Sequence, residues 1–382
     1  MLPPTRLLKA LARAALALLV AVPLLAAPDK PHAKPAPAAE PTLRQYADQL
    51  GFHIGTTMQV KIFNDPRYRE VLGREFNTFV SFTLMRITEP ERDRFDLSPI
   101  DRDVQFARQH QMKLFGASLV YRIGVAAPYW LTERRLGGFT WSKEDLDSIL
   151  KNYIEGIVRY GDDSYYAWEV VDEPVSNPNQ PWQWTFGQVG YISKAFRYAR
   201  ESNRSAALVL NETFGPAGID RAKADRYFDL VKRLKGQGVP IDVAGTELHL
   251  EAQQLRPTYL DELRYFLSRA RSLGLQVYIT EMDLYQGSPG AFPNPLEHQR
   301  QVYHDVLATC LADSSCKTFI VWGVSDARTW LREKQNNPRP DAEPLLFDGE
   351  YQKKPAYFGV LQALQERVAA MKGYGGAQHA GR

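Results

Sequence analysis

The chain has 382 residues, of which 44% are hydrophobic and 24% are charged, and it carries 47 basic against 44 acidic side chains. This composition excludes an intrinsically disordered protein and allows a large buried core. The near balance of charge favours neither a nucleic-acid-binding protein nor one that binds an anionic membrane surface.

The N-terminal part of the chain is predicted to precede the folded domain. Arg6, Lys9 and Arg13 lead into an apolar run that ends in small alanines, which is the layout of a secretory signal peptide over residues 1–27. The apolar run is shorter than the ~20 residues of a membrane span, so stable insertion in a membrane is the less favoured alternative. Residues 28–42 are rich in proline and alanine and predict an extended linker. We expect a secreted or periplasmic protein.

The rest of the chain alternates short apolar runs, rich in β-forming residues, with longer amphipathic stretches. Eight strands are predicted, at residues 53–59, 76–82, 113–120, 166–173, 206–211, 242–250, 276–284 and 318–325. Eight β/α units predict the α/β class and one (β/α)8 TIM barrel over residues 43–372, followed by a disordered tail at 373–382. An open doubly wound sheet is the alternative, but no glycine-rich phosphate loop follows the first strand.

Two of the predicted strands end in a glutamate after an apolar run, Glu173 in WEVVDEP and Glu281 in YITEMD. In a (β/α)8 barrel, the residues that react project from the C-terminal ends of the strands. Glycoside hydrolysis needs one carboxylic acid to protonate the leaving oxygen and one carboxylate to attack the anomeric carbon. Each glutamate alone could instead cap a helix or form a surface ion pair.

Several motifs occur in the order typical of one family. The segments WEVVDEP, ELHL, YITEMD, VWGVSDARTWL and PLLFDGEYQKKPAY resemble WDVVNE, QxHL, ITELD, WGxxDxxSWL and PLLFDxxYxPKPAY of glycoside hydrolase family 10, the retaining endo-xylanases. The resemblance covers most of residues 50–370. It implies that Glu173 is the acid/base and Glu281 the nucleophile, with His249 hydrogen-bonded to the nucleophile. It also implies that no cofactor or metal takes part.

The resemblance extends to the walls of the sugar site, where the sequence also departs from the family. Trp322 and Trp330 match the family's aromatic walls. After the second strand, ENxxKW is replaced by FTLMRI, which removes the xylose grip and places Arg86 where the family has lysine. After the third strand, GHxLVWH becomes GASLVYR, so that Tyr121 and Arg122 replace tryptophan and histidine.

Three further departures change polar groups near the reaction centre. Asn211 begins NETF where the family has NDYN, and Glu247 stands in place of the glutamine of QxHL. Asp172 replaces the asparagine beside the acid/base, and we expect it to be ionised and to hold a sugar hydroxyl or a neighbouring cation. Asp283, two residues after the nucleophile, is expected to be a structural hydrogen-bonding partner.

The two arginines at the ends of adjacent strands, Arg86 and Arg122, are expected to point into the cleft. Two guanidinium groups there would suit an acidic sugar such as a uronate. The alternative is that each arginine pairs with a nearby acid, including Glu247 or Asp172.

The only two cysteines are Cys310 and Cys316. Because an exported protein leaves the reducing cytoplasm, a disulfide is favoured over two free thiols. The family commonly has a disulfide at this place before the eighth strand.

We therefore expect a retaining, endo-acting β-glycoside hydrolase that cleaves xylan or a related polysaccharide, which could be acidic. It should act as a monomer, with the polysaccharide as its partner and without nucleic acid. The competing hypothesis is a catalytically inactive carbohydrate-binding barrel. Loss of the xylose contacts argues for that hypothesis, whereas the survival of two buried acids argues against it.

Overall fold

The computed structural model describes residues 40–379, apart from residues 133, 136–137, 140, 178–180, 288–289, 291 and 335–336. The expected signal peptide and most of the expected linker lie outside the described residues. Within the described part of the chain, no helix is both long enough and apolar enough to span a membrane.

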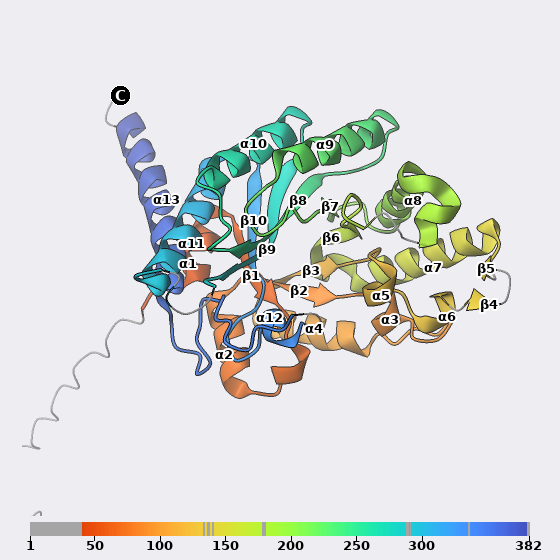
Figure 1. Ribbon diagram of the computed structural model, residues 1–382, viewed down its shortest axis with the longest axis horizontal. Coiled ribbons are helices and arrows are strands. Elements are labelled where there is room, and N and C mark those ends of the chain that lie inside the picture. The colour runs from red at the N-terminus through yellow and green to blue at the C-terminus, as the bar shows by residue number, and fades with distance from the viewer. Residues whose placement is uncertain are drawn as a thin grey trace, which may run out of the picture. The chain divides into compact units, whose positions relative to one another are not determined.

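Eight parallel strands close into a barrel (Figure 1), in the order β1, β2, β3, β6, β7, β8, β9 and β10, with β10 paired to β1. Their bounds are β1 His53–Thr57, β2 Thr78–Phe82, β3 Lys113–Ala117, β6 Tyr165–Asp172, β7 Ala207–Asn211, β8 Val243–Glu251, β9 Gln276–Tyr285 and β10 Cys316–Val321. Each overlaps one of the predicted strands, so the predicted (β/α)8 barrel is confirmed. The short strands β4 Arg134–Arg135 and β5 Gly138–Phe139 form a separate antiparallel pair.

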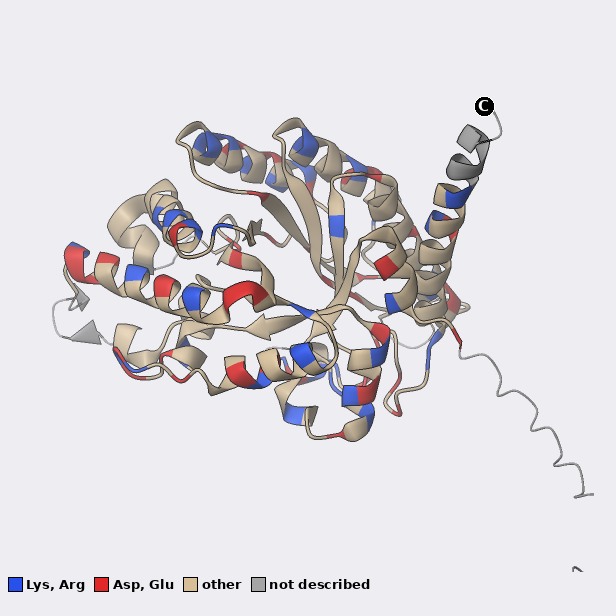
Figure 2. Cartoon of the chain, turned by 180° about the vertical axis from the view of Figure 1, so that it is seen from behind, with Lys and Arg blue, Asp and Glu red and all other residues tan. Residues whose placement is uncertain are grey.

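Helices follow the strands and surround the barrel (Figure 1). They are α1 Leu43–Leu50, α2 Pro66–Glu75, α3 Met85–Thr88, α4 Ser98–Gln109, α5 Ile123–Ala126, α6 Tyr129–Thr132, α7 Lys143–Gly161, α8 Pro181–Ser202, α9 Arg221–Gly236, α10 Tyr259–Ser272, α11 Pro295–Ala312, α12 Trp330–Glu333 and α13 Pro355–His379. Polar residues cap several of their N-termini, as Ser142 does for α7 and Asp220 for α9. Figure 2 shows basic and acidic residues mixed along these outer helices, as the near balance of charge leads one to expect.

The interior of the barrel is filled by apolar side chains, which the strands contribute from their inward faces. This inner cluster consists of Val80, Phe115, Ala117, Ala167, Val209, Val243, Tyr278 and Ile320. Deeper in, the rings of His53 and Tyr166 stack with their centroids 4.0 Å apart. Because the interior is packed, the barrel is not a pore, and its upper layer forms a floor under the C-terminal ends of the strands.

Two features lie outside the barrel itself. Cys310 in α11 and Cys316 at the start of β10 form a disulfide with an S–S distance of 2.02 Å, so the structure contains the expected pairing. The backbone of α13 is helical as far as His379, although residues 373–379 were predicted to be a disordered tail. α13 packs on α1 and α11, and an established helix extends at little further entropic cost.

Candidate active site

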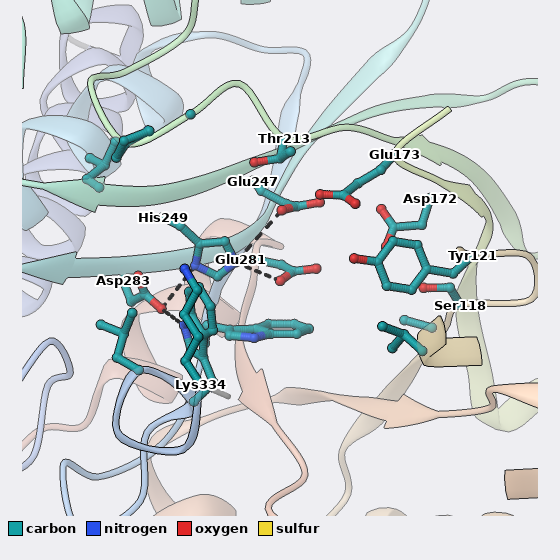
Figure 3. A pocket seen from close by; sticks show the side chains of 18 of the residues that line it. Ser118, Tyr121, Asp172, Glu173, Thr213, Glu247, His249, Glu281, Asp283 and Lys334 are labelled. Carbon is teal, nitrogen blue, oxygen red and sulfur yellow. Dashed lines mark hydrogen bonds and ion pairs between the residues drawn. The ribbon is translucent and has the colours of Figure 1, made fainter. Parts of the chain in front are cut away.

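A cavity of about 560 Å³ opens where the strands of the barrel end. Phe82 closes β2, Asp172 closes β6, and Glu281 lies in the last half of β9; all three line this cavity. Figure 3 shows that the carboxyl groups of Asp172, Glu173, Glu247 and Glu281 face one space. The C-terminal ends of the strands therefore form the polar wall of a single pocket, as predicted for a (β/α)8 barrel.

Glu173 lies directly after β6 and has a backbone φ of +47°, a value that residues with side chains seldom adopt. Its backbone N–H donates to Asn211 O at 3.0 Å, which ties the turn to β7. Its carboxylate accepts a hydrogen bond from the Asn177 side chain. Burial raises the pKa of Glu173, and the Tyr121 hydroxyl and the Arg122 charge offset only part of that effect. The site thus favours the protonated form of Glu173, which a general acid requires.

Glu281 lies on β9, opposite Glu247 of β8 in the strand register. His249 Nε2 lies 2.9 Å from Glu281 Oε2, and His249 Nδ1 lies 3.0 Å from Asp283 Oδ2. Trp330 Nε1 donates to the same Asp283 oxygen at 2.6 Å. Four residues expected in the site are therefore in contact: Glu281, His249, Asp283 and Trp330. Asp283 accepts hydrogen bonds here, which is the structural role expected for it.

The charges in this chain of contacts act in opposite directions. Burial raises the pKa of Glu281 to about 7, while the hydrogen bond and the charge of His249 lower it. For His249, burial by itself would lower the pKa, but Asp283 and Glu281 outweigh burial and raise the pKa well above its usual range. A protonated His249 between two carboxylates therefore helps to keep Glu281 ionised.

Asn211 fixes two more acids from behind. Its Nδ2 group donates to Asp172 Oδ1 at 3.0 Å and to Glu247 Oε1 at 3.1 Å. Thr280 Oγ1 donates to Asn211 Oδ1 at 2.8 Å. A Cβ atom at Gly245 would lie 2.4 Å from that same oxygen, so glycine is needed at this position. Asn211 is fully buried and does not line the cavity, so the expectation that it binds substrate is wrong: it positions the two acids instead.

Asp172 was expected to hold a sugar hydroxyl or a neighbouring cation, and among the described residues no cation is ion-paired with it. Its side chain is buried, and its hydrogen-bonding partner is the Asn211 amide. Burial raises its pKa well above the usual range, and the nearby carboxyl groups of Glu169 and Glu247 raise it further. Acids from separate strands meet here, and this arrangement favours the protonated form of Asp172.

The two arginines differ in their position. Arg122 lines the cavity, with its guanidinium 5.4 Å from the centre of the Tyr121 ring. Arg86 is exposed on α3 and is not among the residues that line the cavity, so its predicted role is wrong. The chain turns into α3 after β2, so that Phe82 and Leu84 line the cavity while Arg86 is exposed. Among the described ion pairs, none joins either arginine to Glu247 or Asp172.

Other residues of the predicted site lie where they were expected, and the structure adds some that were missed. Tyr121, Glu247, Trp322 and Trp330 all line the cavity. The additions include the buried Glu169, which accepts a hydrogen bond from Ser118, and a set of lining residues: Ser118, Thr213, Glu251, Tyr285, Lys334 and Arg339. Residues two apart in a strand lie on the same face, so Glu169 faces inward as Ala167 does, and this pattern could have identified it from the sequence. The loop residues carry no such pattern.

The Asp283→Asn variant tests the contacts around the nucleophile. Asparagine can still accept from Trp330 Nε1, but it removes the negative charge that raises the pKa of His249. His249 then becomes neutral at a lower pH and lowers the pKa of Glu281 less. The Asp283 charge also raises the pKa of Glu281 directly, but this effect is smaller than the lowering by His249. We therefore expect the pKa of Glu281 to rise above about 7, and the acidic limb of the pH profile of kcat/KM to move to higher pH. A variant whose rate falls equally at every pH would show that Asp283 only supports the fold.

Comparisons with known proteins agree with this geometry. A model of the family described as glycosyl hydrolase family 10 matches residues 42–363. Endo-1,4-beta-xylanase B of Thermotoga neapolitana is 31% identical over 337 residues, which cover 85% of this chain and 92% of that protein. The crystal structure of native xylanase 10B from Thermotoga maritima aligns with a TM-score of 0.77 at 30% identity, over 86% of this chain and 100% of its own. Xylanase 10B from Thermotoga petrophila RKU-1, solved in complex with xylobiose, aligns with a TM-score of 0.77 at 30% identity, over 87% and 100%.

Proposed function

This chain belongs to glycosyl hydrolase family 10, and from that premise we propose that it is a retaining, endo-acting β-glycoside hydrolase of xylan or a related polysaccharide. The observation that carries the proposal is the placement of Glu173, directly after β6, and Glu281, in the last half of β9, in one cavity, where each is only 8% exposed. The relatives named as xylanases support xylan as the first substrate to examine.

In the first step, a carboxylate oxygen of Glu281 attacks the anomeric carbon, and the bond from that carbon to the leaving oxygen breaks. Glu173 gives its proton to the leaving oxygen, and the sugar remains bound to Glu281 as an ester. In the second step, Glu173, now a carboxylate, takes a proton from water while the water oxygen attacks the anomeric carbon and releases Glu281. Two inversions restore the β configuration.

The surroundings of the two acids support these roles. Burial raises the pKa of Glu173, which favours the proton it must donate. The His249 cation, itself held by Asp283, lowers the pKa of Glu281 and favours the carboxylate that must attack. A binding protein without catalysis has no need for this separation of roles, which disfavours the inactive alternative.

The remaining parts of the proposal rest on the sequence. Residues 1–27 have the layout of a signal peptide, from which we infer a secreted or periplasmic enzyme. We expect it to act as a monomer, with the polysaccharide as its partner and without a cofactor. An acidic polysaccharide is less well supported as the substrate, because Arg86 does not line the cavity. Arg122 is the one of the two arginines that could bind an acidic sugar there.

The test is digestion of xylan and of xylo-oligosaccharides, followed by proton NMR during the first minutes. The proposal predicts that new reducing ends appear first as the β anomer, and that the viscosity of the polymer falls before many ends are released. New ends that appear first as the α anomer would contradict retention. Binding of oligosaccharides without any new reducing ends would support the inactive barrel.

A further inference from the structure

Asp172 and Glu247, which we call the acid pair, share one donor behind them and face the cavity in front. The two hydrogens of Asn211 Nδ2 serve one oxygen of each acid, at 3.0 Å and 3.1 Å. Both acids line the cavity although they are only 4% and 5% exposed. Figure 3 shows both carboxyl groups directed toward the space between Glu173 and Glu281. The acid pair is therefore built to meet a ligand from one side only.

The acid pair has little counter-charge among the described residues of the cavity wall. No described ion pair includes Asp172, and the described partner of Glu247 is His249, whose Nε2 lies 3.8 Å from Glu247 Oε2 but only 2.9 Å from Glu281 Oε2. Arg339 lies 2.6 Å from Glu251 and is ion-paired with it. Arg122 and Lys334 stand over aromatic rings, at 5.4 Å and 5.0 Å from the ring centres. The ion pairs of the described residues include none from these three cations to the acid pair. His249 is also in contact with Glu281 and Asp283, so its charge is shared among three acids. Buried acids whose charge is incompletely compensated lower stability, which a cationic ligand would offset.

The acid pair also lies beside the atoms that react. An oxygen of Glu247, a ring nitrogen of His249 and an oxygen of Glu281 all lie within 4.8 Å of one another. Asp172 directly precedes Glu173 in the chain. Because Glu281 must touch the anomeric carbon, groups this near to it contact the substituent on the neighbouring ring carbon, where hydrogen bonds strengthen in the transition state.

The chemistry of that substituent follows from what carboxyl groups accept. An ammonium group offers three donors and a positive charge, whereas a hydroxyl group offers one donor and no charge. We propose that the sugar cleaved by this enzyme carries a free amino group on the ring carbon next to its anomeric carbon. The substrate would then be a polymer of deacetylated or partly deacetylated amino sugars. This inference rests on the proposed glycoside hydrolase function and names the substrate class of the same site.

Protonation of the acid pair gives a further reason for this choice. Burial raises the pKa of both acids well above the usual range, with nearby carboxyl groups adding to the effect. An ammonium group between them favours their ionised forms, and two carboxylates then offset the positive charge that develops on the sugar ring beside the ammonium group.

The test compares three aryl β-glycosides that differ only at this ring carbon: a glucoside, a glucosaminide and an N-acetylglucosaminide. At a pH where the amine is protonated, wild-type kcat/KM should favour the glucosaminide over the glucoside by at least tenfold, and the acetamide should react slowest. In the variant with both Asp172→Asn and Glu247→Gln, this preference should vanish or reverse while the glucoside is still cleaved. Equal wild-type rates, or a variant that slows equally on all three, would overturn the inference.

The Glu251→Gln variant is the matched control. It replaces one acid of the same cavity, but one that Arg339 already pairs, so the preference for the amine should persist. If the preference vanished there too, the net charge of the cavity rather than the acid pair would be responsible.

A binding measurement separates this inference from the proposed function. Calorimetry with the Glu281→Gln variant should show chitosan oligosaccharides binding at least tenfold more tightly than xylo-oligosaccharides. Turnover of the neutral glucoside with no preference for the amine in either measurement would overturn the amino-sugar inference and leave the hydrolase standing. Selective binding of the amino sugar without turnover of any substrate would overturn the hydrolase and keep the amino-sugar site.

Discussion

Replacing Glu281 by glutamine is expected to lower kcat on an oligosaccharide substrate by about 10⁴-fold or more, because an amide cannot form the glycosyl ester through which the reaction passes. Glutamine keeps the length of the side chain, and its oxygen can still accept from His249 Nε2, now 2.9 Å from a Glu281 oxygen. The fold should therefore be unchanged by circular dichroism. The control is the Glu251→Gln variant, whose kcat on the same substrate should fall by less than tenfold.

Rescue of an inactive Glu281 variant by azide tests whether Glu281 is the nucleophile, because the configuration of the azide product shows from which face the azide attacked. A Glu281→Gly variant leaves space on the face of the sugar opposite the leaving group. Azide that enters there with an activated β-glycoside should give the α-glycosyl azide, in a single inversion. A Glu281 variant that keeps more than a tenth of the wild-type rate, or whose rescue yields the β azide, would contradict the nucleophile assignment.

Replacing Glu173 by alanine is expected to lower kcat/KM on a substrate with a sugar leaving group by about 10³-fold, because the leaving oxygen must then depart without a proton. The loss should be far smaller for a dinitrophenyl glycoside, whose leaving group needs no protonation. Rates on the two substrates, measured side by side, separate these effects. The basic limb of the pH profile, which reports loss of the proton from Glu173, should also disappear.

The control for this variant is Asn177→Ala, which removes the described side-chain donor to Glu173 but leaves the acid in place. It should change the two substrates alike. Azide with the Glu173→Ala variant should give the β azide, the opposite of the Glu281 result, because azide then attacks the glycosyl ester from the open side. An equal loss on both substrates for Glu173→Ala would contradict a role as general acid.

Much of the fold and the centre of the site could be predicted from the sequence. Each of the eight strands is buried on both faces and reads as a short apolar run, which is a strong local pattern. Glu173 and Glu281 interrupt two such runs at their ends, where a (β/α)8 barrel places its reactive groups. His249 was identified through the resemblance of ELHL to the family motif, and the structure places it between Glu281 and Asp283.

The errors concern contacts between segments that lie far apart in the chain. The raised pKa of Asp172 depends on its burial and on acids of β6 and β8 that only the closed barrel brings together. The outward position of Arg86 depends on how the chain turns after β2, which no local pattern specifies. Asn211 carries an amide side chain of the kind that binds sugar hydroxyls. Its hydrogen bonds to the two acids show that it positions them instead. Lys334 and Arg339 come from a loop without periodicity.

The central claim is that Glu281 forms a covalent bond to the sugar, and trapping that species is the most direct test of it. A 2-deoxy-2-fluoro β-glycoside with a dinitrophenolate leaving group slows both steps, because fluorine disfavours positive charge on the ring, but the good leaving group keeps the first step the faster one. After an acid quench and proteolysis, mass spectrometry should find one sugar on the peptide that contains Glu281. A sugar on a different peptide, or turnover of the reagent with no labelled peptide, would contradict the mechanism.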